Sequence, residues 1–198
     1  MHSKTFIALL RGVNVGGHNR VPMSELRASC EKLGLAGVQT YIQSGNLLLK
    51  SDWGALRLEE SIERLIERTF ALSIPVIVRS AADWTTALRG NPFPEASREE
   101  PNAVMLGLSK TTPKQDAANE LAARALAGER VKRVGDAIWI HFATGFGRSK
   151  LTPQFLDKAL GSPVTLRNWR TVLKLDELAK GMTPRGGRAP FSPSGSFI

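Results

Sequence analysis

Apolar residues recur along this chain so that the same order of strands and helices is predicted twice. The first half is expected to contain strand 4–11, helix 22–33, strands 38–43 and 46–50, helix 55–71, strand 74–79 and helix 81–89. The second half is expected to contain strand 102–108, helix 113–127, strands 131–135 and 137–142, helix 153–160, strand 163–166 and helix 168–180. Each half therefore predicts a split βαβ, ferredoxin-like unit with one added helix. The fold class that follows is α+β, with two antiparallel sheets.

Turn-forming residues divide this pattern into segments. Gln43–Asn46 and Gly135–Asp136 predict the two hairpin turns, the first because Gly45 and Asn46 tolerate a positive φ. Residues 91–101 combine prolines with charged side chains, which is typical of a connection between domains. We therefore expect an N-terminal ferredoxin-like subdomain over 1–90, a C-terminal basic one over 102–181, and a flexible tail over 182–198.

The composition and charge narrow the class of protein. Of the 198 residues, 42% are hydrophobic and 23% are charged, which is ordinary for a soluble globular protein. No apolar run approaches the roughly 20 residues of a membrane span, and one cysteine excludes an internal disulfide, so we expect a cytoplasmic protein without membrane contact. Residues 1–99 carry 12 Lys/Arg against 10 Asp/Glu (+2), and residues 100–198 carry 15 against 8 (+7). This asymmetry favours a phosphate-bearing partner, and solubility alone is the alternative explanation.

The segment between the first expected strand and helix, Arg11–Arg20, is rich in glycine, asparagine and arginine. A loop that joins a strand to a helix can present backbone N–H groups to an anion. Its candidate residues are Arg11, Asn14, Gly16 and Gly17, and their spacing fits neither the dinucleotide-binding fingerprint nor a P-loop. The loop therefore predicts a place for an anion without identifying the ligand.

A second glycine-rich loop follows the third expected strand of the C-terminal half. Gly145 and Gly147 free its backbone to turn, while Arg148, Ser149 and Lys150 supply hydrogen-bond donors suited to an anion. The alternative is a loop that needs glycine only for its turns and carries solvated basic side chains.

The last expected helix begins with a cluster of basic residues. Arg167 and Asn168 are predicted at its N-terminus, where a cation opposes the helix dipole and a bound anion would explain its presence. Arg170 and Lys174 fall on the same face as Arg167 at 100° per residue. A solvated basic face, with Trp169 in the core, is the alternative.

Two other reactive side chains are expected to be structural. Cys30 lies on the apolar face of its helix, and His141 follows an alternating strand, so both are predicted to pack in or beside a core. The chain has three histidines and no paired metal-ligand spacing, so we expect no transition-metal site and no cofactor is implied.

Four segments together resemble a family of uncharacterised bacterial proteins known as Domain of Unknown Function 1697 (DUF1697). The segments are Ala8–Gly17, Thr40–Asn46, Gly145–Leu151 and Arg167–Lys174. The resemblance implies a two-part α+β fold and supplies no activity. The positions it singles out are Arg11, Asn14, Gly16, Gly17, Gln43, Ser44, Asn46, Gly145, Gly147, Arg148, Ser149, Lys150, Arg167 and Asn168.

Three functions follow from these residues. The favoured one is binding of a phosphate-bearing ligand, a nucleotide or nucleic acid, at a basic groove between the subdomains formed by those positions with Arg170 and Lys174. Single-stranded nucleic acid on a sheet face is one form of it, although Phe6 is the only aromatic residue in strands 4–11 and 102–108.

The second function is a small enzyme acting on a phosphorylated or carboxylated metabolite. In that case Arg11, Arg148 and Arg167 would hold the substrate, and His18 or Ser149 would take part in the chemistry, although His18 has no identifiable carboxylate partner. The third is a protein-interaction module without small-molecule chemistry. The ligand-binding hypotheses share one requirement, that the glycine-rich loops come together in space.

Overall fold

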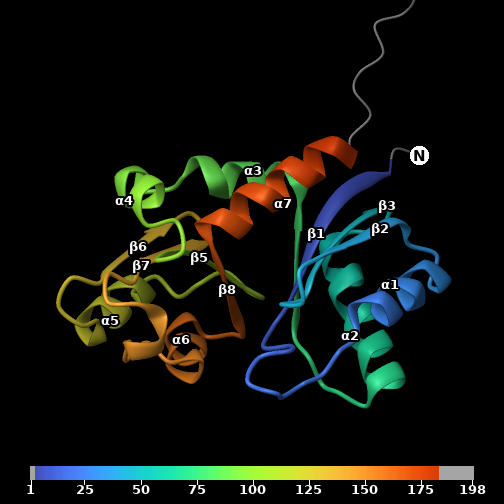
Figure 1. The fold of residues 1–198 in the computed structure, drawn as a ribbon, viewed down its shortest axis with the longest axis horizontal. Helices are drawn as coiled ribbons and strands as arrows, with labels where there is room; N and C mark the ends of the chain where they lie inside the picture. The colour runs from blue at the N-terminus through green and yellow to red at the C-terminus, as the bar shows by residue number, and fades with distance from the viewer. Residues whose placement is uncertain (1–2, 183–198) are drawn as a thin grey trace, which may run out of the picture.

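The computed structural model describes residues 3–182 and contains two halves, each built on one sheet (Figure 1). The first half comprises β1 (Lys4–Leu10), α1 (Met23–Lys32), β2 (Ala36–Tyr41), β3 (Asn46–Ser51), α2 (Ala55–Phe70), β4 (Val76–Ser80) and α3 (Ala81–Arg89). The second comprises β5 (Val104–Ser109), α5 (Ala117–Arg124), β6 (Arg130–Val134), β7 (Ala137–His141), α6 (Pro153–Leu160), β8 (Val164–Asn168) and α7 (Trp169–Met182). A short helix, α4 (Pro94–Glu99), lies in the connection.

The two sheets have the same topology. Their strand orders are β2-β3-β1-β4 and β6-β7-β5-β8, and every neighbouring pair is antiparallel. This is the ferredoxin-like order with the first strand of each half in the sheet interior. The α+β class with two tandem ferredoxin-like units is therefore confirmed. The hairpins predicted around Gln43–Asn46 and Gly135–Asp136 are also present.

Several expected boundaries are wrong. The helix expected over 113–127 covers only Ala117–Arg124, and the connection over 91–101 holds a helix of its own. Arg167 and Asn168 complete β8, because they pair with β5, and α7 begins after them. The prediction that the last helix starts at these two residues is therefore wrong for Arg167, whereas Asn168 directly precedes α7 and caps it through its side chain.

Each sheet buries one face against its own pair of helices. Alternation along β1 points Phe6, Ala8 and Leu10 toward α1 and α2. In the second half, Ile138 and Ile140 of β7 pack against α5 and α6. These two outer cores account for the amphipathic helices that the sequence predicts.

The opposite faces of the two sheets share a third core. Ile7 and Leu9 of β1 lie in the same buried cluster as Leu106 and Leu108 of β5. Helices α3 and α7 contact each other and contribute to this cluster, and Figure 1 shows them lying across the upper side of both sheets. The hypothesis that single-stranded nucleic acid binds an open sheet face is therefore wrong, because the face of each sheet that is not covered by its own helix pair is buried in this shared core.

The division into units at 1–90 and 102–181 stays a prediction, since the shared core shows contact between the halves rather than independent folding. Within residues 3–182, no helix is long and apolar enough to cross a membrane. The tail expected over 182–198 falls outside the described residues, except for Met182, which ends α7.

Candidate functional site

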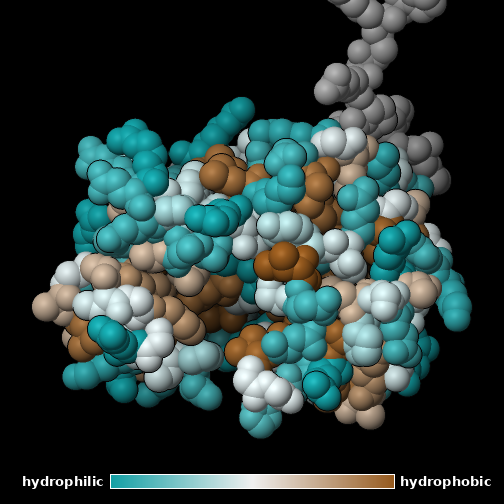
Figure 2. Space-filling model, viewed as in Figure 1, coloured by the Kyte–Doolittle hydropathy of each residue, from teal (hydrophilic) through white to brown (hydrophobic). Residues whose placement is uncertain are grey.

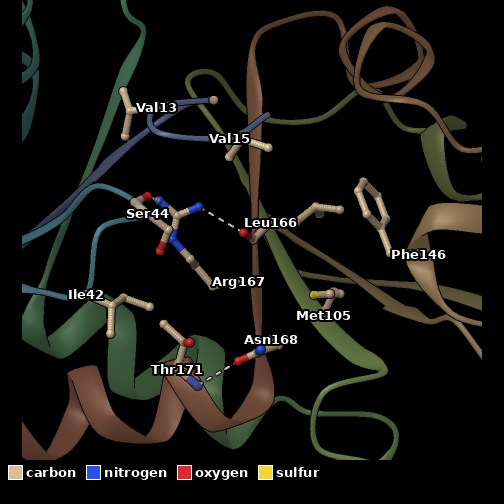
Figure 3. A pocket seen from close by; sticks show the side chains of 11 residues that line it. Val13, Val15, Ile42, Ser44, Met105, Phe146, Leu166, Arg167, Asn168 and Thr171 are labelled. Atoms are coloured by element: carbon tan, nitrogen blue, oxygen red, sulfur yellow. Dashed lines mark hydrogen bonds between the residues drawn. The ribbon is translucent and has the colours of Figure 1, made fainter. Parts of the chain in front are cut away.

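A pocket of about 250 Å³ lies where the two halves meet, and all four segments that carry the family resemblance reach it (Figure 3). It is lined by Gly12, Val13, Val15, Ile42, Ser44, Met105, Phe146, Leu166, Arg167, Asn168 and Thr171. The first glycine loop, the hairpin turn, the second glycine loop and β8 thus converge, although they are far apart in the sequence.

The first glycine loop owes its glycines to a tight turn. Asn14 N–H donates to the carbonyl of Asn19 at 3.1 Å, and a β-bridge joins Val15 to His18. Gly16 and Gly17 between them have φ of 59° and 80°, the positive values that a two-residue hairpin turn requires. The loop is a small hairpin whose tip exposes 62% of Val15 beside the pocket.

Asn14 acts as a cross-link within the N-terminal half. Its side-chain oxygen accepts from Val21 N–H at 2.9 Å, and its Nδ2 donates to the carbonyls of Val21 at 2.9 Å and Gln43 at 2.8 Å. The side chain of Asn14 therefore holds the glycine loop against the β2–β3 turn. Gln43 itself lines a separate groove beside α1.

The β2–β3 turn packs directly onto the end of β1. Positive φ occurs at Ile42 (49°) and Gly45 (76°), whereas Asn46 is a strand residue, so the expectation of a positive φ at Asn46 is wrong. A Cβ on Gly45 would lie 2.5 Å from Val13 Cγ2 and 2.7 Å from Leu10 Cβ. Glycine is required there both by the backbone conformation and by the close approach.

Arg167 reaches across from β8 and is bound on every N–H. Its Nε donates to Asn46 Oδ1 at 2.5 Å, and Nη1 donates to Thr165 Oγ1 at 2.7 Å. The other carbonyl acceptors belong to Leu166, Leu10, Ser44 and Gly45. Arg167 is 8% exposed, and burial lowers its pKa to about 10, so it stays protonated at neutral pH.

All of these acceptors are neutral. Among the described residues no carboxylate lies within ion-pair distance of the Arg167 guanidinium, whereas Arg11 has a carboxylate partner. Arg11 Nη2 is 2.6 Å from Asp157, and its Nε donates to the carbonyl of Val164 at 3.1 Å. Two of the three arginines expected to hold a ligand, Arg11 and Arg167, are thus engaged with the protein, and of these two Arg167 lacks a counter-charge.

The second glycine loop contributes an aromatic wall. Phe146 begins a 3-10 turn, packs edge-on against Phe142 at 5.2 Å between ring centroids, and remains 39% exposed. Ser149 Oγ accepts from the Leu151 N–H at 3.1 Å, which shows a local structural role.

The charged side chains of this loop are exposed. Arg148 and Lys150 lie on the surface and form no ion pair within residues 3–182. They follow Phe146 two and four positions later in the same loop and are not part of the pocket lining. Gly145 has a φ of 87°, which glycine adopts readily, while Gly147 lies in open space. These two cations remain available to a ligand.

Of the remaining predicted residues, Asn168 lines the pocket, whereas Arg170 and Lys174 lie outside its lining. Asn168 Oδ1 caps the start of α7 by accepting from the Thr171 N–H at 2.9 Å. Arg170 is exposed, and Lys174 pairs with Glu177 at 2.9 Å, so neither lines the pocket.

The sequence did not point to most of the pocket wall. Val15, Ile42, Met105, Phe146 and Leu166 are apolar and belong to five different segments. Figure 2 shows apolar surface exposed along the junction of the halves on the face in view. An apolar residue inside each glycine loop was the one available signal, and it pointed to Val15 and Phe146.

The reactive side chains outside the pocket are structural. Cys30 is fully buried, and burial raises the pKa of its thiol to about 12. His141 is 7% exposed and lies between Glu100 at 2.9 Å and Arg130 at 3.3 Å. Both side chains are packed, as the sequence predicts.

Comparison with known proteins gives the family. The family described as "Protein of unknown function (DUF1697)" matches residues 3–139. The chain belongs to the DUF1697 family. The DUF1697 match contains the first two of the four segments and ends before the second glycine loop and β8.

One solved structure is similar over nearly all of both chains. The conserved bacterial protein SP0830 from Streptococcus pneumoniae is 23% identical, with 90% of this chain and 99% of that chain covered at a TM-score of 0.70. At this identity the likeness shows the fold alone. A search of curated proteins finds no match.

Proposed function

We propose that this protein binds a small phosphate-bearing ligand, such as a nucleotide, in the pocket between its halves. The observation that carries the proposal is the convergence of four separate segments on that one pocket. Its walls combine apolar side chains with the Ser44, Asn168 and Thr171 polar groups, which is typical of a site for a flat ligand with polar edges.

The phosphate would be held from the rim. Arg148 and Lys150 follow Phe146 in the second glycine loop and have no carboxylate partner within the described residues. Arginine and lysine bind phosphate oxygens through charge-assisted hydrogen bonds. Since the ring of Phe146 lines the pocket beside them, one loop supplies both an apolar wall and cations.

A nucleotide fits the structure better than a nucleic-acid strand. The sheet faces that could carry stacked bases are buried in the shared core. Nucleic acid remains a form of the proposal only along the exposed basic surface of the second half, where binding would fall steeply with salt.

Binding is also favoured over catalysis. Among the described residues, the pocket lining contains no histidine, cysteine, lysine or carboxylate. His18 and Ser149, the candidates for chemistry, are not part of the lining either. A general base is therefore lacking at the site.

The cytoplasmic location also stays a prediction.

A thermal-shift screen tests the proposal. Wild-type protein would be heated with nucleoside monophosphates, phosphorylated metabolites and short oligonucleotides, since a ligand that prefers the folded state raises Tm. We expect a nucleotide to raise Tm in a concentration-dependent way. Phe146→Ala should weaken that ligand about 5- to 100-fold, the range expected for loss of a stacking ring.

Leu56→Ala is the matched control, because Leu56 is an apolar residue of α2 that is 66% exposed and does not belong to the pocket lining. It should leave the affinity unchanged. If no compound at millimolar concentration raises Tm, or if both variants weaken binding equally, the proposed site is wrong.

A protein partner is the second candidate function. Val15, Ile42 and Phe146 are 62%, 49% and 39% exposed around one pocket, and clustered exposed apolar side chains are typical of an interaction surface. This candidate becomes the better one if the ligand screen gives no shift.

A further inference from the structure

We infer that the pocket selects its ligand by negative charge, and that the buried guanidinium of Arg167 provides the field that does so. The ligand class is a flat apolar molecule carrying one anionic group, whether phosphate, carboxylate or sulfonate. This inference rests on the pocket proposed above as a ligand site.

The charge balance around the pocket supports the inference. Arg167 is the only charged residue among those that line it, and every acceptor around its guanidinium is neutral. The carboxylate of Asp157 belongs to the neighbouring pair with Arg11 and also accepts from Val164 N–H at 2.9 Å. The described lining thus has a net charge of +1 with nothing to offset it.

A buried charge of this kind acts strongly on its surroundings. Removing a cation from water without a counter-ion costs free energy, and a nearby anion recovers part of it. Apolar walls keep the effective dielectric low, so the attraction between Arg167 and an anion in the pocket is screened less than at the surface.

The mode of recognition follows from the hydrogen bonds. The five N–H groups of the Arg167 guanidinium are already hydrogen-bonded to protein oxygens. They are therefore not available for a bidentate contact, and the ligand anion would be recognised by its charge. Recognition by charge discriminates an anion from a neutral molecule and is tolerant of the anion's geometry. A direct bidentate contact would instead distinguish phosphate from sulfonate.

The size and wall chemistry limit the apolar part. A pocket of about 250 Å³ lies just below the usual range for ligand sites, so it would enclose a two-ring system and leave any further ring at its opening. In Figure 3, Phe146 and Met105 lie on one side of β8, and Ile42 and Val13 lie on the other. A ring between these side chains would bring its anionic substituent, held at the rim by Arg148 and Lys150, into the field of Arg167.

Two fluorescent probes with the same rings test this. 1-Anilinonaphthalene-8-sulfonate is an anion, and N-phenyl-1-naphthylamine lacks the sulfonate, so their difference in affinity measures the contribution of charge. We expect saturable binding of the anion, displaced by adenosine monophosphate, with a Kd about 10- to 100-fold below that of the neutral probe.

Variants separate the ring from the charge. Phe146→Ala should weaken both probes to a similar extent and keep the ratio of their two Kd values, whereas Arg167→Met should bring that ratio close to one. If Arg167→Met does not fold, Arg167→Lys keeps the charge and should keep the preference. Circular dichroism would verify that each variant is folded.

The outcomes distinguish this inference from the proposed function. Equal affinity for both probes in the wild type, with a nucleotide still raising Tm, would overturn charge selection and leave the ligand site standing. A preference for the anion that survives Arg167→Met would overturn the role of Arg167. Binding of neither probe, without any shift from the nucleotide screen, would overturn both proposals.

Discussion

Arg11 and Arg167 cross the boundary between the two halves in opposite directions. Arg11, at the end of β1, binds the carbonyl of Val164 and the carboxylate of Asp157 in the second half. Arg167, in β8, binds Asn46 and three carbonyls in the first half. The pocket lies beside this reciprocal pair, so the same contacts that join the halves also shape the candidate site.

Arg167→Lys should destabilise the protein although the charge is kept. A lysine has three donors on one atom and cannot reach acceptors spread around a planar guanidinium, so several buried carbonyls and Asn46 Oδ1 lose a partner. We expect a loss of about 2–4 kcal/mol in the free energy of unfolding, measured by urea titration.

The neighbouring Arg170→Lys provides the control for that variant. Arg170 is exposed and its side chain forms no hydrogen bond or ion pair with the described residues, so the change should stay within about 0.5 kcal/mol. Equal effects of the two substitutions would contradict the role assigned to Arg167.

Gly45→Ala should be poorly tolerated. The new Cβ would lie 2.5 Å from Val13 and 2.7 Å from Leu10, and the φ of 76° disfavours any residue with a Cβ. We expect a loss above about 2 kcal/mol, seen as a lower urea midpoint or as failure to fold. Gly17→Ala is matched in backbone, with a φ of 80°, but has nothing within 4 Å and should lose only about 1 kcal/mol. If both variants lose the same stability, close packing of the turn is not the cause.

Glu59→Gln should change the pH dependence of stability. Glu59 of α2 is 4% exposed and accepts from the N–H of Val78, on edge strand β4, at 2.9 Å. Burial raises the pKa of its carboxyl above the ordinary 4.5, so the folded protein binds this proton more tightly than the unfolded chain.

The sign of the effect follows from that difference. The contribution of Glu59 to folding is greatest below the unfolded pKa and declines as pH rises through the folded pKa. A glutamine keeps an oxygen acceptor and never ionises, so the stability of Glu59→Gln relative to wild type should increase from about pH 4 to pH 7. Urea titrations across this range would show it, with exposed Glu60→Gln as a control that lacks this trend. A flat difference for Glu59→Gln would contradict a raised pKa.

The chain should unfold in a single transition. The core shared by β1, β5, α3 and α7, together with Arg11 and Arg167, couples the halves. Differential scanning calorimetry should therefore give equal calorimetric and van't Hoff enthalpies. Two separate transitions would show that the units predicted over 1–90 and 102–181 are independent.

Local order is what the residues of this chain specify by themselves. The run Phe6–Leu10 is buried on both faces of a central strand, and apolar spacing predicts α2 nearly to its ends. Gly45 predicts a turn because glycine adopts a positive φ more readily than other residues, whatever surrounds the turn in the fold. These features depend on neighbours within a few residues, and the repeated order of elements gives the ferredoxin-like fold class.

Contacts between distant segments are decided only by the tertiary structure. Arg167 is a strand residue because β5 pairs with it, and it is buried because Asn46, 121 positions away, accepts its Nε–H. No local pattern distinguishes this guanidinium from exposed Arg170. The pocket is decided in the same way, since Phe146 of the second half joins Val15 and Ile42 of the first only when the two halves pack together. Periodicity reports which face of an element is apolar, whereas the partner of a side chain depends on how whole elements pack.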